Sequence, residues 1–226
     1  MSKSAMVKEQ LLRLGPRLGA GNLARLRSAL GYLEIGAMAR DQLASGALAV
    51  VNDRFMVFAE AMKCIRGQSP LYLEFGVFEG ETMRWWCDNL ATPRARFVGF
   101  DSFEGLPEGW RPGFAQGQFS TAGPPDVGDA RASFVTGWFD ETLPAFVMPS
   151  HDQLIVNIDS DLYSSARTVL DWVMPHLKSG SLLYFDELAD RDHELRALQE
   201  VVAATNFQLL PRAAGGGGAH FLFEVR

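Results

Sequence analysis

Cysteines, long apolar runs and an excess of basic residues are all missing from this sequence. Only Cys64 and Cys87 occur among 226 residues, which is too few for a disulfide framework and is typical of the reducing cytoplasm. No apolar run approaches the roughly 18 residues of a membrane span, and the N-terminal residues lack the apolar core of a signal peptide. The formal net charge of −6 argues against a nucleic-acid partner. We therefore expect a cytoplasmic protein that binds neither membrane nor nucleic acid.

Several catalytic motifs are absent as well. The chain has no Gly-x-Ser-x-Gly elbow, no HExxH helix and no P-loop, and its four histidines stand at no metal-ligand spacing. These absences weaken assignment as a serine hydrolase, a zinc protease or a nucleoside triphosphatase. The composition, 47% hydrophobic and 21% charged, is that of a folded globular protein. The length favours one large domain with a small appendage.

Residues 1–67 are predicted to form an N-terminal helical extension. Leucines recur at helical spacing in two stretches, which Gly15 and Pro16 separate. Asn22 and Asp53 are candidate N-caps of the second and third helices. The apolar faces predict an extension that either caps the main domain or mediates self-association into a homo-oligomer.

Residues 68–226 are predicted to form an α/β domain. Continuous apolar runs predict buried strands at 71–75, 97–101, 154–159 and 181–186. Helical patterns alternate with these strands, which is typical of a doubly wound, mostly parallel sheet covered on both faces. The last two strands, at 207–210 and 220–225, are joined by a glycine-rich connection without a helix, and predict an antiparallel hairpin at the sheet edge.

A long connection rich in glycine and proline runs from residue 102 to about residue 129. Long irregular segments in compact domains are usually functional. This one leaves the carboxyl end of a strand, where open α/β sheets bind ligands. It therefore predicts a lid, with a passive loop as the alternative.

The segment from Glu74 to Thr82 links a strand to a helix but departs from the dinucleotide fingerprint. Its glycines stand at positions 76 and 80, and its three glutamates would repel a pyrophosphate. S-adenosylmethionine carries a sulfonium and an ammonium group and no phosphate, so an acidic loop suits it. Gly76 would let the backbone approach this cofactor, Thr82 would bond its carboxylate, and Asp101 would accept its ribose hydroxyls. The alternative is a tight strand–helix turn without a ligand.

Acidic residues follow two further predicted strands. Asp159 and Asp161 follow one strand, and Asp186 and Glu187 follow the next. Strands consecutive in sequence often neighbour each other in space, so these carboxylates are expected at one edge of the sheet. Such a cluster suits a hard divalent cation, Mg²⁺ above all, because it offers only oxygen ligands. The alternative is that Asp159 and Asp161 cap the following helix.

Taken together, these motifs resemble a known family. The matching segments are 74–80, 99–107, 137–144, 159–165 and 184–187. Their order and spacing resemble the macrocin O-methyltransferase family of class I S-adenosylmethionine-dependent enzymes, over about residues 54–203. The resemblance implies a seven-stranded, Rossmann-like methyltransferase fold and Mg²⁺-dependent methylation of a sugar hydroxyl. Glu187 stands where the family often has a second aspartate, and residues 188–193 also differ from the family.

The resemblance also implies roles for individual residues. The cofactor-binding residues would be Glu74, Gly76, Phe78, Thr82, Asp101, Ser102, Trp138 and Phe139. Glu74, Gly76 and Thr82 would lie on the methionine side, and Trp138 and Phe139 would border the adenine. Asp159, Asp186 and Glu187 would hold the metal, and Asp159 would also be the catalytic base.

The predicted activity is methyl transfer from S-adenosylmethionine to a hydroxyl of a small-molecule acceptor, such as a sugar-containing natural product. A catechol-type phenolic O-methyltransferase is one alternative, because it also pairs strand-end carboxylates with Mg²⁺. A nicotinamide-dependent oxidoreductase is another, although the glycine spacing counts against it. A cofactor-binding module without catalysis is a third.

Overall fold

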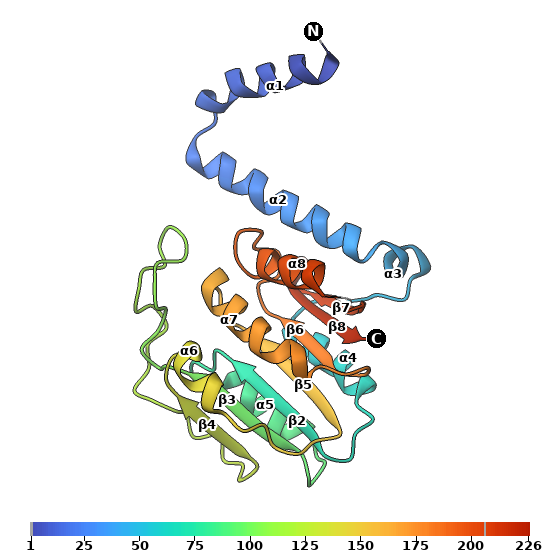
Figure 1. The fold of residues 1–226 in the computed structure, drawn as a ribbon, viewed down its shortest axis with the longest axis vertical. Helices are drawn as coiled ribbons and strands as arrows, with labels where there is room; N and C mark the ends of the chain where they lie inside the picture. Colours follow the sequence, from blue (N-terminus) through green and yellow to red (C-terminus); the bar gives the residue numbers. More distant parts are fainter. Residues whose placement is uncertain (1, 206) are drawn as a thin grey trace.

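A computed structural model describes residues 2–205 and 207–226 (Figure 1). Its centre is a sheet of eight strands in the order β1-β7-β8-β6-β5-β2-β3-β4. The strands are β1 (Ala49–Val50), β2 (Pro70–Phe75), β3 (Arg96–Asp101), β4 (Ala132–Thr136), β5 (Gln153–Ile158), β6 (Leu182–Phe185), β7 (Leu209–Gly215) and β8 (His220–Val225). Strands β2, β3, β4, β5 and β6 pair in parallel, while β8 is antiparallel to both β6 and β7. The predicted mostly parallel α/β sheet with a C-terminal antiparallel hairpin is confirmed.

The prediction of seven strands was wrong by one. The additional strand β1 pairs in parallel with β7 and forms the outer edge, so the hairpin does not end the sheet. A strand of two residues is too short to produce an alternating pattern in the sequence. Strand β7 also runs on to Gly215, into the connection that was predicted to be loop. Gly215 lies so close to the Asp53 carbonyl that a Cβ would stand 2.7 Å from its oxygen.

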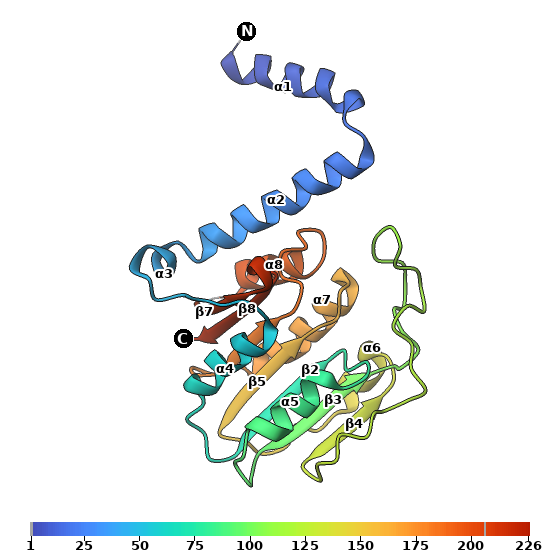
Figure 2. The same ribbon diagram turned by 180° about the vertical axis from the view of Figure 1, so that it is seen from behind.

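Helices cover both faces of the sheet (Figures 1 and 2). On one face α4 (Arg54–Cys64) and α5 (Glu81–Asn89) bury an aromatic cluster that includes Phe58, Tyr72 and Trp86. On the other face lie α6 (Phe139–Thr142), α7 (Tyr163–Val173) and α8 (Glu194–Ala204), over strand residues such as Leu71 and Leu73. Successive strand residues thus point to opposite faces, and both faces are buried.

The N-terminal helices extend away from the sheet. They are α1 (Lys3–Leu14), α2 (Ala20–Met38) and α3 (Arg40–Ser45), with a short 3₁₀ turn, η1 (Gly15–Arg17), after α1. Figure 1 shows α1 far from the sheet, and none of its residues is buried. Helix α2 docks on the loop before α8. There Arg27 pairs with Asp192 at 2.6 Å, and Glu34 pairs with Arg191 at 2.6 Å.

The predicted helix caps had different outcomes. Asp53 caps α4, since its carboxylate accepts a hydrogen bond from the Met56 amide at 2.9 Å. Asn22 caps nothing, because α2 begins earlier, at Ala20, after an extended Gly19. Helix α4 precedes residue 67 but packs on the sheet, and the domain boundary at 67 stays a prediction. Within residues 2–205 and 207–226, no helix has the length and apolarity to cross a bilayer.

Three short 3₁₀ helices complete the chain: η2 (Leu143–Ala145), η3 (Met174–His176) and η4 (Gly216–Gly218). Because β2, β3, β5 and β6 are parallel, their carboxyl ends meet at one edge of the sheet. The loops that leave this edge carry the glycine loop after β2, the long connection after β3 and the acidic residues after β5 and β6.

Candidate active site

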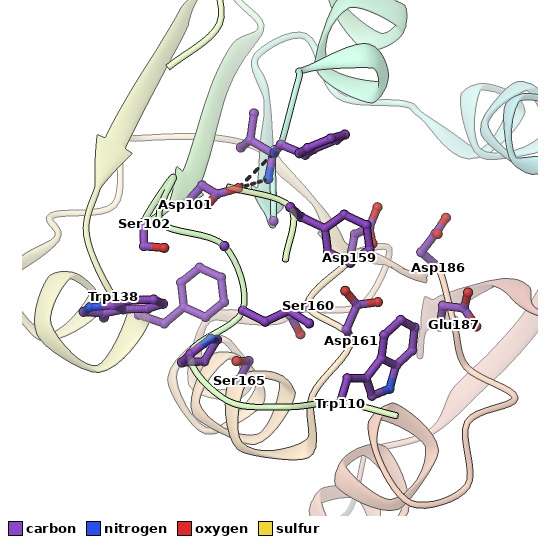
Figure 3. A pocket seen from close by; sticks show the side chains of 18 of the residues that line it. Asp101, Ser102, Trp110, Trp138, Asp159, Ser160, Asp161, Ser165, Asp186 and Glu187 are labelled. Atoms are coloured by element: carbon purple, nitrogen blue, oxygen red, sulfur yellow. Dashed lines mark hydrogen bonds between the residues drawn. The ribbon is translucent and has the colours of Figure 1, made fainter. Parts of the chain in front are cut away.

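A cavity of about 1110 Å³ opens at the carboxyl edge of the parallel strands. Its volume exceeds that of a typical site for one small ligand, so a cofactor and an acceptor could share it. The predicted site residues that line it are Gly76, Phe78, Thr82, Asp101, Ser102, Trp138, Phe139, Asp159, Asp186 and Glu187. In Figure 3, Asp101, Ser102 and Trp138 lie toward one side of this cavity, Asp186 and Glu187 lie toward the other, and Asp159 lies between.

Glu74 is the predicted site residue that does not line the cavity. Its carboxyl group is fully buried beneath α5, where it accepts hydrogen bonds from Tyr72 Oη, at 2.9 Å, and from the Thr82 hydroxyl. Burial raises the pKa of Glu74 to about 8. Glu74 therefore touches the cavity only through Thr82, whose hydroxyl was expected to bond the cofactor carboxylate.

Gly76 allows two strand ends to meet. Its φ of +91° is a left-handed conformation that suits glycine, and a Cβ at this position would stand 1.8 Å from the Asp159 carbonyl oxygen. Gly76 was predicted to allow a close approach by the ligand. The structure adds a packing reason, since only glycine lets the loop after β2 lie against the end of β5.

Asp101 organises the loop that it faces. One carboxylate oxygen accepts hydrogen bonds from the amides of Val77 and Phe78, at 2.8 and 2.9 Å, as the dashed lines in Figure 3 show. The other oxygen accepts from the Phe103 amide at 2.8 Å. Asp101 thus fixes the glycine loop and the start of the long connection at the cavity wall.

In the part of the chain that the structure describes, four residues other than glycine adopt positive φ, and all four lie in segments that border the cavity. They are Phe78 at 51°, Phe103 at 60°, Phe119 at 68° and Asp161 at 60°. Such conformations are uncommon for bulky side chains and tend to cluster at functional sites. All four lie in the glycine loop, in the long connection or directly after β5, which are the three segments predicted to meet a ligand.

The long connection, residues 102–129, is called the lid after its predicted role, which stays a prediction. A chain of aromatic rings lines the cavity from Phe78 to Phe119, Phe114 and Trp110, with centroid separations of 5.7, 5.8 and 5.2 Å. The Trp110 indole N–H donates to Asp190 at 3.1 Å, and the Ser164 hydroxyl donates to Glu108 at 2.7 Å. Aromatic packing and hydrogen bonds from two neighbouring segments therefore hold the lid.

Strands β5 and β6 pair in parallel, so the acidic residues that follow them lie at one edge of the sheet. The pKa values of these acidic residues diverge. Burial and the charge of Asp186 raise the pKa of Asp159, and burial and Glu187 raise that of Asp161 to about 7. Burial also acts to raise the pKa of Asp186, but a hydrogen bond from His220 and the charges of His220 and Arg54 outweigh it and lower the pKa. Paired carboxyl groups with divergent pKa values are typical of sites that handle protons.

The predicted metal ligands do not form a closed group. Among the residues that the structure describes, no three His, Cys, Asp or Glu side chains lie close enough to hold a metal ion. Instead, the Arg54 Nη1 atom lies 3.8 Å from Asp159 and 3.7 Å from Asp186, and Arg111 lies 3.7 Å from Glu187. The donor set itself, carboxylate oxygens that repel one another, suits a hard divalent cation.

Three residues that shape this site were not predicted from the sequence: Arg54, His220 and Glu194. His220 Nδ1 lies 3.0 Å from the Asp186 carboxylate. Glu194 is fully buried and accepts hydrogen bonds from the Ser160 and Glu187 amides, each at 3.2 Å, which ties the two acidic strand ends together. No local motif marks these residues, although a glutamate beside the apolar stripe of α8 was a usable signal.

Residues 73–188 match the family described as the methyltransferase domain. A curated 8-demethyl-8-(2,3-dimethoxy-alpha-L-rhamnosyl)-tetracenomycin-C 4'-O-methyltransferase from Streptomyces olivaceus is 34% identical over 61 residues. That match covers 27% of this chain and about a quarter, 23%, of the relative's length.

Solved methyltransferase structures share the fold. The calicheamicin methyltransferase CalS11 matches with a TM-score of 0.56 and 21% identity, covering 96% of this chain and 85% of that chain. The O-methyltransferase NovP matches with a TM-score of 0.52 and 19% identity, over 76% of each chain. The chain belongs to the methyltransferase domain family.

Proposed function

We propose that this protein is an S-adenosylmethionine-dependent O-methyltransferase. Its acceptor is a hydroxyl group of a small-molecule natural product, and a sugar-containing product is the first candidate. The observation that carries the proposal is one cavity that joins the glycine loop and Asp101 at one side to the carboxylates of Asp159, Asp186 and Glu187 at the other. The fold supports the proposal, as do the activities for which two similar proteins are named. CalS11 is described as a TDP-rhamnose 3'-O-methyltransferase, and the tetracenomycin relative carries a rhamnosyl acceptor in its name.

The cofactor would occupy the side of the cavity near the glycine loop. Trp138 and Phe139 would flank the adenine, and Asp101 and Ser102 would meet the ribose. Glu79 and Glu81 also line the cavity, and their charge complements the positive groups of the cofactor. Glu74 would act from beneath, by fixing Thr82.

The acceptor would lie under the lid. Trp110, Arg111 and Phe114 line this part, with the Arg111 guanidinium 3.6 Å above the Trp110 ring and 4.8 Å from the Phe114 ring. Aromatic faces bury the apolar side of a sugar or polyketide ring, and the guanidinium donates hydrogen bonds to acceptor oxygens. This combination supports an acceptor that is partly apolar and rich in oxygen.

In the proposed reaction, an acceptor oxygen attacks the methyl carbon of the sulfonium. The carbon–sulfur bond breaks, its electron pair stays on sulfur, and the hydroxyl proton goes to Asp159. A raised pKa makes Asp159 a stronger base than an exposed aspartate. Arg54 and His220 hold the neighbouring Asp186, and the lid excludes water during the transfer.

A divalent cation fits the same carboxylates by donor type. Asp159, Asp186 and Glu187 would hold it, and it would lower the pKa of the acceptor hydroxyl. One structure with a similar fold, CmcI, is described with Mg and SAM, at a TM-score of 0.53 and 15% identity over 77% of this chain and 73% of that chain. The metal requirement therefore belongs to the proposal, together with the residues assigned to it.

Calorimetric titration with S-adenosylmethionine and S-adenosylhomocysteine, followed by an acceptor screen of glycosides and catechols, tests the function. We expect Asp159→Asn to lower turnover at least about 100-fold while cofactor affinity stays within about threefold, because Asp159 acts on the acceptor proton. Asp171→Asn, on the exposed side of α7, is the matched control and should change neither. Absence of cofactor binding refutes the function, and unchanged turnover in Asp159→Asn refutes the assigned base.

A further inference from the structure

Arg54 lies where the acidic strand ends face each other. It is the first residue of α4, and the cap by Asp53 fixes the start of that helix. Its Nη1 atom lies 3.8 Å from an Asp159 oxygen and 3.7 Å from an Asp186 oxygen, and its side chain is 32% exposed toward the cavity. One cation thus faces both carboxylates.

The two carboxylates depend on Arg54 to different degrees. Asp186 has other partners, since the same oxygen accepts from Tyr184 Oη at 2.7 Å and lies 3.0 Å from His220 Nδ1. In the part of the chain that the structure describes, Asp159 forms its ion pair with Arg54 alone. Removing Arg54 would therefore leave Asp159 without a cationic partner.

The contact is loose. Charge-assisted hydrogen bonds between guanidinium and carboxylate are about 2.7–2.9 Å long, and both distances here exceed this range. The side chain is long and rotatable, and the charge of Glu81 on the same cavity wall also attracts it. Arg54 can therefore leave the pair without crossing a packed core.

The cation and the carboxylates come from different parts of the chain. Asp159 and Asp186 belong to residues 73–188, which match the methyltransferase domain, whereas Arg54 precedes that region. An arginine stays charged at any ordinary pH, so only movement of the side chain can remove its charge from the site.

We propose that Arg54 occupies the position of a divalent cation between Asp159 and Asp186 and competes with such a cation for this pair. The inference rests on the proposed function only in that it uses the same carboxylates. Arg54 then sets the metal affinity of the site. Its guanidinium between Asp159 and Asp186 also explains why the acidic side chains do not close into a metal-binding group. A metal ion binds when the guanidinium swings aside toward Glu81.

The test is a titration of the 226-residue chain with Mn²⁺, monitored by calorimetry and by the loss of the free-ion electron paramagnetic resonance signal. The wild-type chain should bind weakly, with a roughly millimolar dissociation constant. Arg54→Met should bind at least about tenfold more tightly, because removal of the competing charge leaves the carboxylates to the metal. Arg54→Lys keeps a charge and should lie closer to wild type.

Arg84→Met is the matched control. Arg84 lines the same cavity, but its guanidinium donates to the backbone carbonyls of Glu79 and Asp126 and not to the carboxylates. Its loss should change Mn²⁺ affinity by less than about threefold. Unchanged affinity in Arg54→Met, an equal gain in Arg84→Met, or micromolar binding by the wild type would each overturn the proposal. If Arg54→Met does not fold, Arg54→Gln replaces it, and the wild-type affinity still decides.

Titration of the same proteins with S-adenosylmethionine separates this inference from the proposed function. If the wild type does not bind S-adenosylmethionine while Arg54→Met binds Mn²⁺ more tightly than the wild type, the function is refuted and the role of Arg54 is supported. If the wild type binds S-adenosylmethionine and Arg54→Met leaves Mn²⁺ affinity unchanged, the function is supported and the role of Arg54 is refuted.

Discussion

Glu74 is a fully buried carboxyl group, and its surroundings make folding depend on pH. Its pKa is raised from 4.5 to about 8, mainly by burial, although hydrogen bonds from Thr82 and Tyr72 oppose the shift. Over this range the folded protein holds a proton that the unfolded chain releases. The stabilisation by protonated Glu74 is therefore complete below about pH 4.5 and is lost as the pH rises through about 8.

We expect Glu74→Gln to remove this pH dependence. The amide has nearly the shape of the protonated acid, so it can donate to Thr82 and accept from Tyr72. Between about pH 6 and about pH 9 the wild type should lose roughly 3 kcal/mol of unfolding free energy more than the variant does. Urea unfolding at the two pH values measures the difference. Equal pH slopes would mean that Glu74 titrates near its ordinary value.

The sequence could have revealed that Glu74 faces the core. Side chains of a strand alternate between faces, so Glu74 shares a face with Tyr72, which packs under α5. Glu74 was instead predicted to bind the cofactor from the family motif, which carries no information on the orientation of the side chain. The position of Asp101 at the cavity was predictable from its strand end. Its three backbone partners were not, because they depend on the fold of the loops.

At the scale of elements, burial decides which strands the sequence reveals. Strands β2, β3, β5 and β6 lie within two residues of their predicted limits, because continuous apolar runs mark strands buried on both faces. Strand β4 went unpredicted. It lies at the edge of the sheet and is half exposed, and the sequence Ala-Ser-Phe-Val-Thr is too mixed to stand out.

The candidate site shows the same division. The strand-end acids and the glycine loop were found because each follows a recognisable strand. Arg54 could not be found, since its meeting with Asp159 and Asp186 joins segments more than a hundred residues apart in the sequence. Such contacts arise from the packing of α4 against the sheet, which no local pattern encodes.

The contacts that hold the lid can be tested by a single substitution. Trp110→Phe keeps a ring against Phe114 but removes the indole hydrogen bond to Asp190. Loss of one hydrogen bond worth about 1 kcal/mol should raise lid opening roughly fivefold. We expect the amides of Leu106 and Gly117, which bond to carbonyls within the lid, to exchange with deuterium faster by this factor.

Trp172→Phe is the control for the lid experiment. Trp172 packs against Phe75 and Phe100 on the sheet, away from Asp190, so exchange in the lid should not change. If Trp110→Phe leaves the exchange of Leu106 and Gly117 unchanged, the hydrogen bond to Asp190 does not hold the lid, and aromatic packing alone must do so.

At the scale of the whole molecule, the N-terminal helices differ from the rest in charge and in exposure. Residues 3–38 carry six basic and two acidic side chains, although the whole chain has a net charge of −6. Apolar side chains on the same helices face outward: Leu11 is 61% exposed, Leu12 77% and Leu33 69%. These helices form a basic, apolar arm, and the rest of the chain forms an acidic body. The arm is therefore complementary in charge to the body of a second copy. We therefore propose that these helices join two copies of the chain.

Light scattering and sedimentation test this proposal. The wild type should be a dimer or larger at about 100 µM, and Leu12→Glu combined with Leu33→Glu should weaken association at least about 100-fold, because two carboxylates would be buried in an apolar contact. High salt should also weaken association, since the arm and the body carry opposite charge. Val147→Glu places the same charge on a side chain that is 86% exposed outside these helices, and should leave the mass unchanged. A monomeric wild type, or a double variant of unchanged mass, would mean that the exposed leucines serve no contact between copies of this chain.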